Sequence, residues 1–170
     1  MRLVFTLFGA LMLNGCLGMP ETVKPVDDFE ISQYLGKWYE VARLDHSFEE
    51  GLERVSAEYI ELEKSGIAVI NRGYDPLSQE WQQANGEAYF VTHNDIGYLQ
   101  VSFFGPFYSS YVVFGLDKQN YQYAFVSGPT LDYLWLLSRT PTVSDEVMGE
   151  FLNQAKERGF NTDELIFVKH

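Results

Sequence analysis

The chain offers few residues that could carry out catalysis. Its three histidines are His46, His93 and His170. Only His46 stands in a cluster that resembles a metal or acid–base site, the segment Asp45-His46-Ser47-Phe48-Glu49-Glu50. However, adjacent residues of an extended segment point to opposite faces, and no second histidine stands at ligand spacing. We therefore expect a solvated loop histidine at position 46 and no metal site.

Motifs of nucleophilic and nucleotide-dependent enzymes are also missing from the sequence. It contains no G-x-S-x-G nucleophile elbow, no P-loop and no dinucleotide-binding fingerprint. We expect no cofactor and no chemical step. An enzyme acting on lipids or small apolar metabolites is the alternative, and tyrosines of a binding pocket would be its only candidate polar groups.

Composition narrows the classes of partner. The chain has 24 Asp plus Glu against 12 Lys plus Arg, a formal charge of −12, which argues against nucleic acid because affinity for phosphate backbones comes mainly from cationic side chains. It also has 13 Phe, 11 Tyr and 3 Trp. An acidic exterior combined with so many rings implies that the rings pack in an interior or line a binding site.

The single cysteine, Cys16, follows a segment with the composition of a secretory signal. Arg2 precedes an uncharged apolar run, residues 3–13, which is too short to span a bilayer as a helix. The run Leu13-Asn14-Gly15-Cys16 resembles the lipobox of bacterial lipoproteins, in which the cysteine becomes the lipid-modified first residue. Residues 1–15 are then a signal peptide, Cys16 the lipid attachment site and residues 16–28 a lipidated tether. A secreted protein with a free thiol is the alternative.

The residue after the cysteine bears on localisation. In bacterial lipoproteins an aspartate at that position retains the protein in the inner membrane, whereas this chain has Leu17. The resemblance therefore implies a protein attached to the outer membrane through Cys16 and facing the periplasm.

Eight short β-prone runs lie between Gly36 and Arg139. They cover residues 36–44, 54–62, 67–74, 80–91, 98–103, 110–117, 121–127 and 133–139. Turn residues separate them, as in Asp75-Pro76 and Gly128-Pro129, and no helical pattern intervenes. This spacing predicts an antiparallel meander.

The faces of these runs favour closure of the meander into a barrel. Leu99, Val101 and Phe103 share one face of the fifth run, while the eighth run, Tyr133 to Leu137, is apolar on both faces. One face can line an interior and the other can be covered from outside. An up-and-down barrel of eight strands is wide enough to hold one small ligand.

A C-terminal helix is the predicted cover. Ser144 is a plausible N-cap, Asp145 and Glu146 suit the first turn, and Gly159 is placed to end the helix. Its apolar stripe consists of Val147, Met148, Phe151, Leu152 and Ala155. The sequence thus predicts an all-β fold, an eight-stranded antiparallel up-and-down β-barrel with one C-terminal α-helix packed outside and a short ninth strand within residues 165–168.

Gly36-Lys37-Trp38-Tyr39 resembles the G-x-W-Y signature that opens the first strand of lipocalins. Arg139 falls where lipocalins place an arginine against that tryptophan, and residues 117–123 fall at their second conserved region. The mature chain closely resembles the bacterial outer-membrane lipocalins and their apolipoprotein D-related relatives. The stretches that carry this similarity are residues 34–43, 48–59, 101–108 and 132–141. The resemblance implies a lipocalin domain over residues 29–170 and packing of Arg139 on Trp38 at the closed barrel end.

Five residues are the candidates for ligand binding. Trp135 and Phe103 lie on inward faces by strand parity and, like Tyr59 and Asn71, match pocket positions of related lipocalins. Tyr108 could offer a hydroxyl to a polar head group at the mouth. The alternative is that all five are structural. Arg43, Arg54 and Arg72 are possible partners for an anionic head group.

The function that the resemblance implies is binding of lysophospholipids or fatty acids, for storage or transport in the cell envelope. Besides the enzyme, a second alternative is an envelope interaction protein whose barrel is filled by its own side chains. The bacterial relatives also suggest a homodimer.

Overall fold

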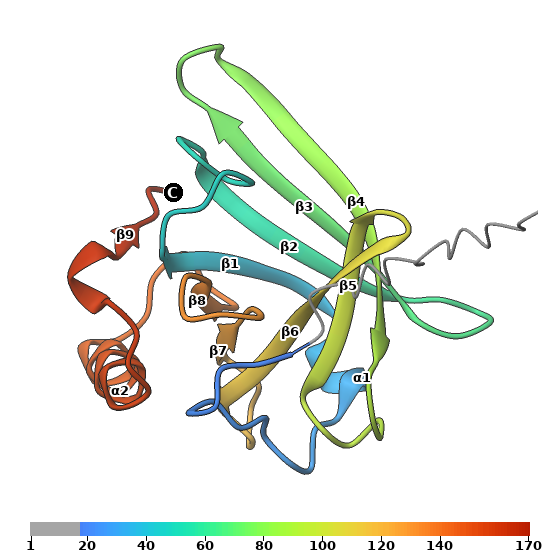
Figure 1. Ribbon diagram of the computed structural model, residues 1–170. Helices are drawn as coiled ribbons and strands as arrows, with labels where there is room; N and C mark the ends of the chain where they lie inside the picture. The colour runs from blue at the N-terminus through green and yellow to red at the C-terminus, as the bar shows by residue number, and fades with distance from the viewer. Residues whose placement is uncertain (1–17) are drawn as a thin grey trace, which may run out of the picture.

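The computed structural model describes residues 18–170, so the predicted signal peptide and the lipid attachment site Cys16 lie outside the described residues. Figure 1 shows a strongly curved sheet with a helix on its outside. The elements are α1 (Ile31–Tyr34), β1 (Gly36–Arg43), β2 (Glu53–Glu61), β3 (Ile67–Asp75), β4 (Glu80–Phe90), β5 (Tyr98–Phe104), β6 (Phe107–Leu116), β7 (Tyr123–Ser127), β8 (Leu134–Ser138), α2 (Asp145–Glu157), the 3-10 turn η1 (Thr162–Glu164) and β9 (Ile166–Phe167).

The predicted fold class is confirmed. Consecutive strands pair antiparallel from β2 to β8, β8 pairs with β1, and β1 pairs back with β2 to close the ring. The closing pair runs from Gly36 opposite Tyr59 to Tyr39 opposite Ser56. Beyond Tyr39, β2 no longer pairs with β1, and β9 pairs with Ala42 and Arg43 instead. The ninth strand therefore lies outside the ring and extends one edge of β1.

Successive side chains along each strand point alternately into and out of the barrel, and this produces two separate hydrophobic cores. Inward side chains such as Trp38, Val69 and Leu137 form one cluster inside the barrel. Outward side chains such as Leu134 and Leu136 form a second cluster with Phe151 of α2, whose ring centroid lies 5.2 Å from that of Phe125. Strand β8 therefore contributes one face to each core, as its two apolar faces predict.

Helix α2 begins and ends as its sequence predicts. Ser144 Oγ accepts the backbone N–H of Val147, and Gly159 has a φ of 90°, a left-handed conformation that a glycine adopts without strain. Phe151 and Ala155 are fully buried against the barrel. No helix within residues 18–170 is long and apolar enough to cross a membrane.

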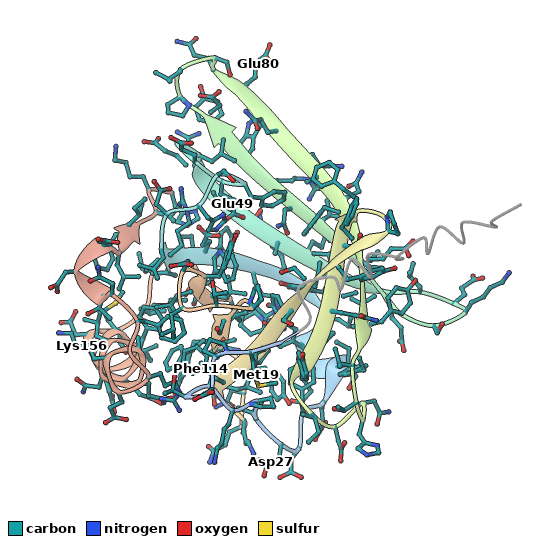
Figure 2. All side chains as sticks on the ribbon, in the orientation of Figure 1. Met19, Asp27, Glu49, Glu80, Phe114 and Lys156 are labelled. Atoms are coloured by element: carbon teal, nitrogen blue, oxygen red, sulfur yellow. The ribbon has the colours of Figure 1, made fainter. Side chains whose placement is uncertain are left out.

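The two ends of the barrel differ. Helix α1 lies at one end, where Arg139 places its Cζ atom 3.9 Å from the ring centroid of Trp38. The guanidinium also donates to the carbonyl oxygens of Tyr121 (3.2 Å), Lys37 (2.9 Å) and Gln33 (2.7 Å). Figure 2 shows Asp27 at this closed end, with Glu49 and Glu80 toward the other. The other end of the barrel is open. The chain reverses direction there through four connections, residues 44–52, 76–79, 105–106 and 128–133.

Candidate ligand cavity

A cavity of about 250 Å³ occupies the barrel interior and reaches the open end. An adjoining space of about 290 Å³ at the mouth shares four of its lining residues, Phe48, Glu49, Val55 and Asn71. Both spaces approach the size range of small-molecule sites. The main cavity is lined by Glu40, His46, Phe48, Glu49, Val55, Ser56, Ala57, Tyr59, Val69, Asn71, Val101, Phe103, Ser109, Ser110, Tyr111, Pro129, Tyr133, Trp135 and Leu137.

The floor of the cavity is a set of mutually bonded tyrosines. Tyr111 Oη lies 2.6 Å from Tyr34 Oη and 2.8 Å from Tyr59 Oη. Burial raises the pKa of all three phenols, so they stay neutral at physiological pH. Below them, Trp38 Nε1 donates to Tyr34 O at 2.7 Å. Two hydrogen bonds thus join the three hydroxyls, and the aromatic rings make the rest of the floor apolar.

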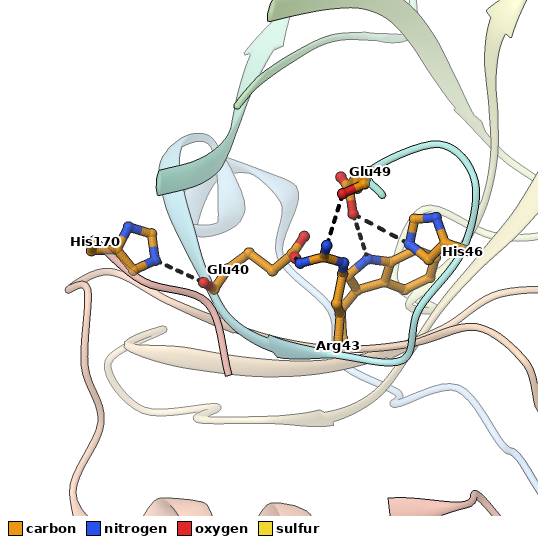
Figure 3. A network of polar contacts seen from close by, with 6 residues as sticks. Glu40, Arg43, His46, Glu49 and His170 are labelled. Atoms are coloured by element: carbon orange, nitrogen blue, oxygen red, sulfur yellow. Dashed lines mark hydrogen bonds and ion pairs between the residues drawn. The ribbon is translucent and has the colours of Figure 1, made fainter. Parts of the chain in front are cut away.

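Toward the mouth, the wall contains a buried network of charged side chains (Figure 3). Arg43 Nη1 donates to Glu40 Oε1 at 3.2 Å, and Arg43 Nη2 donates to the backbone oxygen of Glu49 at 2.7 Å. Glu49 Oε2 lies 3.2 Å from its donor Trp135 Nε1 and 3.3 Å from His46 Nε2. The side chains of Arg43, Glu40 and Glu49 are 1%, 4% and 6% exposed.

The two carboxyls of this network titrate in opposite directions. Burial, followed by the charge of Glu49, raises the pKa of Glu40 well above its ordinary value, and Arg43 only partly offsets this. Burial alone would also raise the pKa of Glu49, but hydrogen bonds from His46, Glu40 and Trp135 outweigh it and lower that pKa. The surroundings therefore favour the neutral form of Glu40 and the ionised form of Glu49.

Four of the five predicted ligand-binding residues line this cavity. Trp135, Phe103, Tyr59 and Asn71 come from β8, β5, β2 and β3 and meet there. Tyr108 does not line it, because its ring packs on Tyr89, with centroids 6.3 Å apart. The pairing of β5 with β6 changes register between Val101 and Phe104, so strand alternation does not predict which side chains near this turn point inward.

The prediction of a solvated loop histidine at position 46 is wrong. The His46 side chain is 7% exposed, lines the cavity and lies in edge contact with Trp135, with ring centroids 5.1 Å apart. The loop after β1 folds back over the mouth and carries His46 and Glu49 inward. Within residues 18–170, no group of three or more His, Cys, Asp or Glu side chains is arranged to hold a metal ion.

Two further residues of the site were not among the predicted ligand-binding residues. Glu40 is two residues after Trp38 in the same strand, so both side chains point to the same face of the sheet. This alternation could have predicted that Glu40 points into the barrel. Glu49 carries no such signal, because its position depends on how the loop folds. The cationic candidates lie elsewhere: Arg43 is held behind Glu40, and Arg72 pairs with Glu58 at 3.1 Å. Arg54 packs over the Tyr74 ring.

Several exposed apolar side chains lie on the strand ends and turns of the open end. They are Phe48, Leu77, Trp81, Phe104 and Phe107, of which Phe104 is 72% and Phe107 66% exposed. Phe48 lines the main cavity and Phe104 the adjoining space, so part of this apolar surface borders the mouth.

Comparison with known proteins agrees with this architecture. Residues 29–170 match the model of the lipocalin-like domain family. The chain is 62% identical to the outer membrane lipoprotein Blc of Vibrio cholerae, over 99% of both chains, and 28% identical to mouse apolipoprotein D, over 82% of this chain and 76% of that one. Among solved structures, insecticyanin of the tobacco hornworm Manduca sexta superposes with a TM-score of 0.72 at 21% identity, covering 90% of this chain and 87% of that one.

These findings confirm the resemblance and the predicted localisation. Several near relatives are named as outer membrane lipoproteins, and this chain shares that lipid-anchored, outer-membrane localisation. The closed eight-stranded barrel, its external helix and the similarity over residues 29–170 together show that the chain belongs to the lipocalin family.

Proposed function

We propose that the chain binds one single-chain lipid, a lysophospholipid or a fatty acid, inside the barrel and stores or transports it at the outer membrane. The observation that carries this proposal is a cavity with a largely aromatic floor, whose tyrosine hydroxyls are bonded to one another, and a polar wall near its mouth. This arrangement matches an amphiphile that enters tail first. No step of the proposed function makes or breaks a covalent bond.

The energetics favour a long acyl chain. Burying methylene groups stabilises by roughly 0.8 kcal/mol each, so an acyl chain of about sixteen carbons gains on the order of 10 kcal/mol before ordering costs. The membrane offers the same chain a similar environment, so net transfer depends on how well the protein accommodates the head group.

Attachment of the mature chain through Cys16 would keep the cavity close to its source of lipid. Residues 1–15 would be removed as a signal peptide and residues 16–28 would act as the tether. A thioether-linked diacylglyceryl group together with an N-acyl chain exceeds the two anchoring signals needed for stable membrane attachment.

Native mass spectrometry of the purified protein with lysophosphatidylethanolamine tests the proposal. We expect one lipid per chain and no product over several hours. Release of product would indicate the lipid-metabolising enzyme instead. Absence of any adduct, together with unchanged Trp135 fluorescence, would support a filled barrel that serves as an interaction module. The same spectra report whether the protein is a monomer or the homodimer suggested by its relatives.

A further inference from the structure

The acidic and basic side chains that line the main cavity do not suit a fatty acid. They are Glu40, His46 and Glu49, and no lysine or arginine lines the cavity among residues 18–170. Arg43 belongs to the same network but stays behind Glu40, with its side chain 1% exposed. A carboxylate entering this cavity would therefore meet the charge of Glu49 without a lysine or arginine to pair with.

Two buried acceptors at this level lack a partner within the described residues. They are Oδ1 of Asn71 and one nitrogen of the His46 ring, since both ring nitrogens lack a hydrogen-bond partner and a neutral imidazole has one acceptor nitrogen. When neutral His46 directs its Nε2–H toward Glu49 Oε2, 3.3 Å away, Nδ1 carries a lone pair and can only accept. A buried acceptor without a hydrogen bond lowers stability, so a ligand that brings donors to these atoms is favoured.

Glu49 adds the negative charge. Its carboxylate receives hydrogen bonds from Trp135 and Glu40 and faces His46, yet a carboxylate has about four lone-pair positions, so it can accept a further donor. Phe48 and Tyr133 line the same part of the cavity. The wall near the mouth thus presents acceptors and one negative charge among aromatic rings.

The floor presents the opposite chemistry. The hydroxyls of Tyr34, Tyr59 and Tyr111 are bonded to one another, and apolar side chains such as Val69 and Leu137 lie at that depth. An amphiphile therefore places its tail on the floor and its polar group at the level of Asn71, His46 and Glu49.

We propose that Asn71, His46 and Glu49 form a head-group subsite for a primary ammonium, as carried by a single-chain phospholipid with an ethanolamine head. This inference rests on the proposed lipid-binding function and specifies its ligand class. A primary ammonium brings both positive charge and three N–H donors. A quaternary ammonium brings the charge alone and leaves the acceptors unpaired, and an ionised fatty acid brings neither.

A series of lysophospholipids with one acyl chain tests the subsite without altering the protein. The head groups are ethanolamine, its N-methyl and N,N-dimethyl derivatives, and choline, which lose donors one at a time while keeping the charge. The protein is the mature chain with Cys16→Ser, so that no attached acyl chain competes. Residues 18–170 contain the contacts that close the barrel, so this chain retains its fold.

We expect the dissociation constant, measured by tryptophan fluorescence titration, to rise along the series by about tenfold or more from ethanolamine to choline. Asn71→Leu and Glu49→Gln should flatten the series, with circular dichroism confirming that they fold. Glu58→Gln is the matched control, because Glu58 pairs with Arg72 and does not line the cavity. It should keep the full preference.

Two results would overturn the subsite. If all four lipids bind with equal affinity, or choline binds more tightly, the acceptors do not select donors, while the lipid-binding function stands. If no single-chain lipid binds, the proposed function itself fails, and the subsite fails with it.

Discussion

Replacement of Arg139 by methionine should destabilise the barrel more than the same exchange at any other partly exposed arginine or lysine among residues 18–170. Methionine keeps the apolar length of the side chain but removes the charge and all donors. The structure gives Arg139 three hydrogen bonds to backbone carbonyls of three different segments and a position 3.9 Å above Trp38. These contacts tie α1, β1 and the segment before β7 to the end of β8.

The magnitude follows from these contacts. Hydrogen bonds from a charged donor contribute about 1.5–3 kcal/mol each, and a cation–π contact about 0.5–2 kcal/mol. Arg139 is half-buried, so water can replace part of each interaction. We therefore expect Arg139→Met to lower the free energy of unfolding by about 3–5 kcal/mol, or the melting temperature by roughly 10 °C.

Urea denaturation followed by circular dichroism measures this change. The matched control is Arg158→Met, because Arg158 also stacks on a ring, that of Phe114, but makes one side-chain hydrogen bond to a backbone oxygen, within its own helix. We expect a loss of about 1 kcal/mol for the control. Equal losses for the two variants would refute the assignment of Arg139 as the residue that holds the closed end together.

Three further predictions concern the cavity and the anchor. Trp135→Ala should weaken binding of lysophosphatidylethanolamine by about 2–4 kcal/mol in a native mass spectrometry titration. Tyr108 lies outside the cavity, so Tyr108→Phe should leave the affinity unchanged. If Trp135→Ala also leaves the affinity unchanged, this ring is not part of the site. Burial raises the pKa of Glu40, so above about pH 4.5 the native state binds more protons than the unfolded chain, and stability falls as pH rises toward the native pKa. Glu40→Gln cannot titrate, and its melting temperature should therefore fall less than that of the wild type between about pH 5 and pH 8; parallel curves would contradict the pKa assignment. Cys16→Ser should appear in the soluble fraction after cell lysis, and continued membrane retention would refute the lipid anchor.

Much of the barrel could be predicted because local signals mark its elements. Turn residues such as Asp75-Pro76 and Gly128-Pro129 separate the strands, and the two apolar faces of β8 require one core inside the barrel and one outside. Ser144 and Gly159 bound the helix by local backbone chemistry alone. These signals act over a few residues, which is why they can be read from sequence.

The polar part of the cavity could not be predicted in the same way. His46 and Glu49 lie in a loop, and their burial follows from its folding back onto Trp135, 86 positions beyond Glu49 in the chain. Tyr108 was expected to offer its hydroxyl at the mouth, but its ring packs on Tyr89, and the β5–β6 pairing changes register before it. Both cases depend on contacts or irregularities that strand periodicity does not contain.

The orientation of the bound lipid inside the barrel can be measured. Solution NMR of the Cys16→Ser mature chain with ¹³C-labelled methyl groups would record nuclear Overhauser contacts to lysophosphatidylethanolamine. The cavity predicts contacts from the terminal acyl methyl to Val69 and Leu137, deep in the barrel, and from the ethanolamine methylenes to residues near the mouth. Contacts confined to the exposed outer side chains, or a reversed lipid with its head group at the tyrosine floor, would contradict the account.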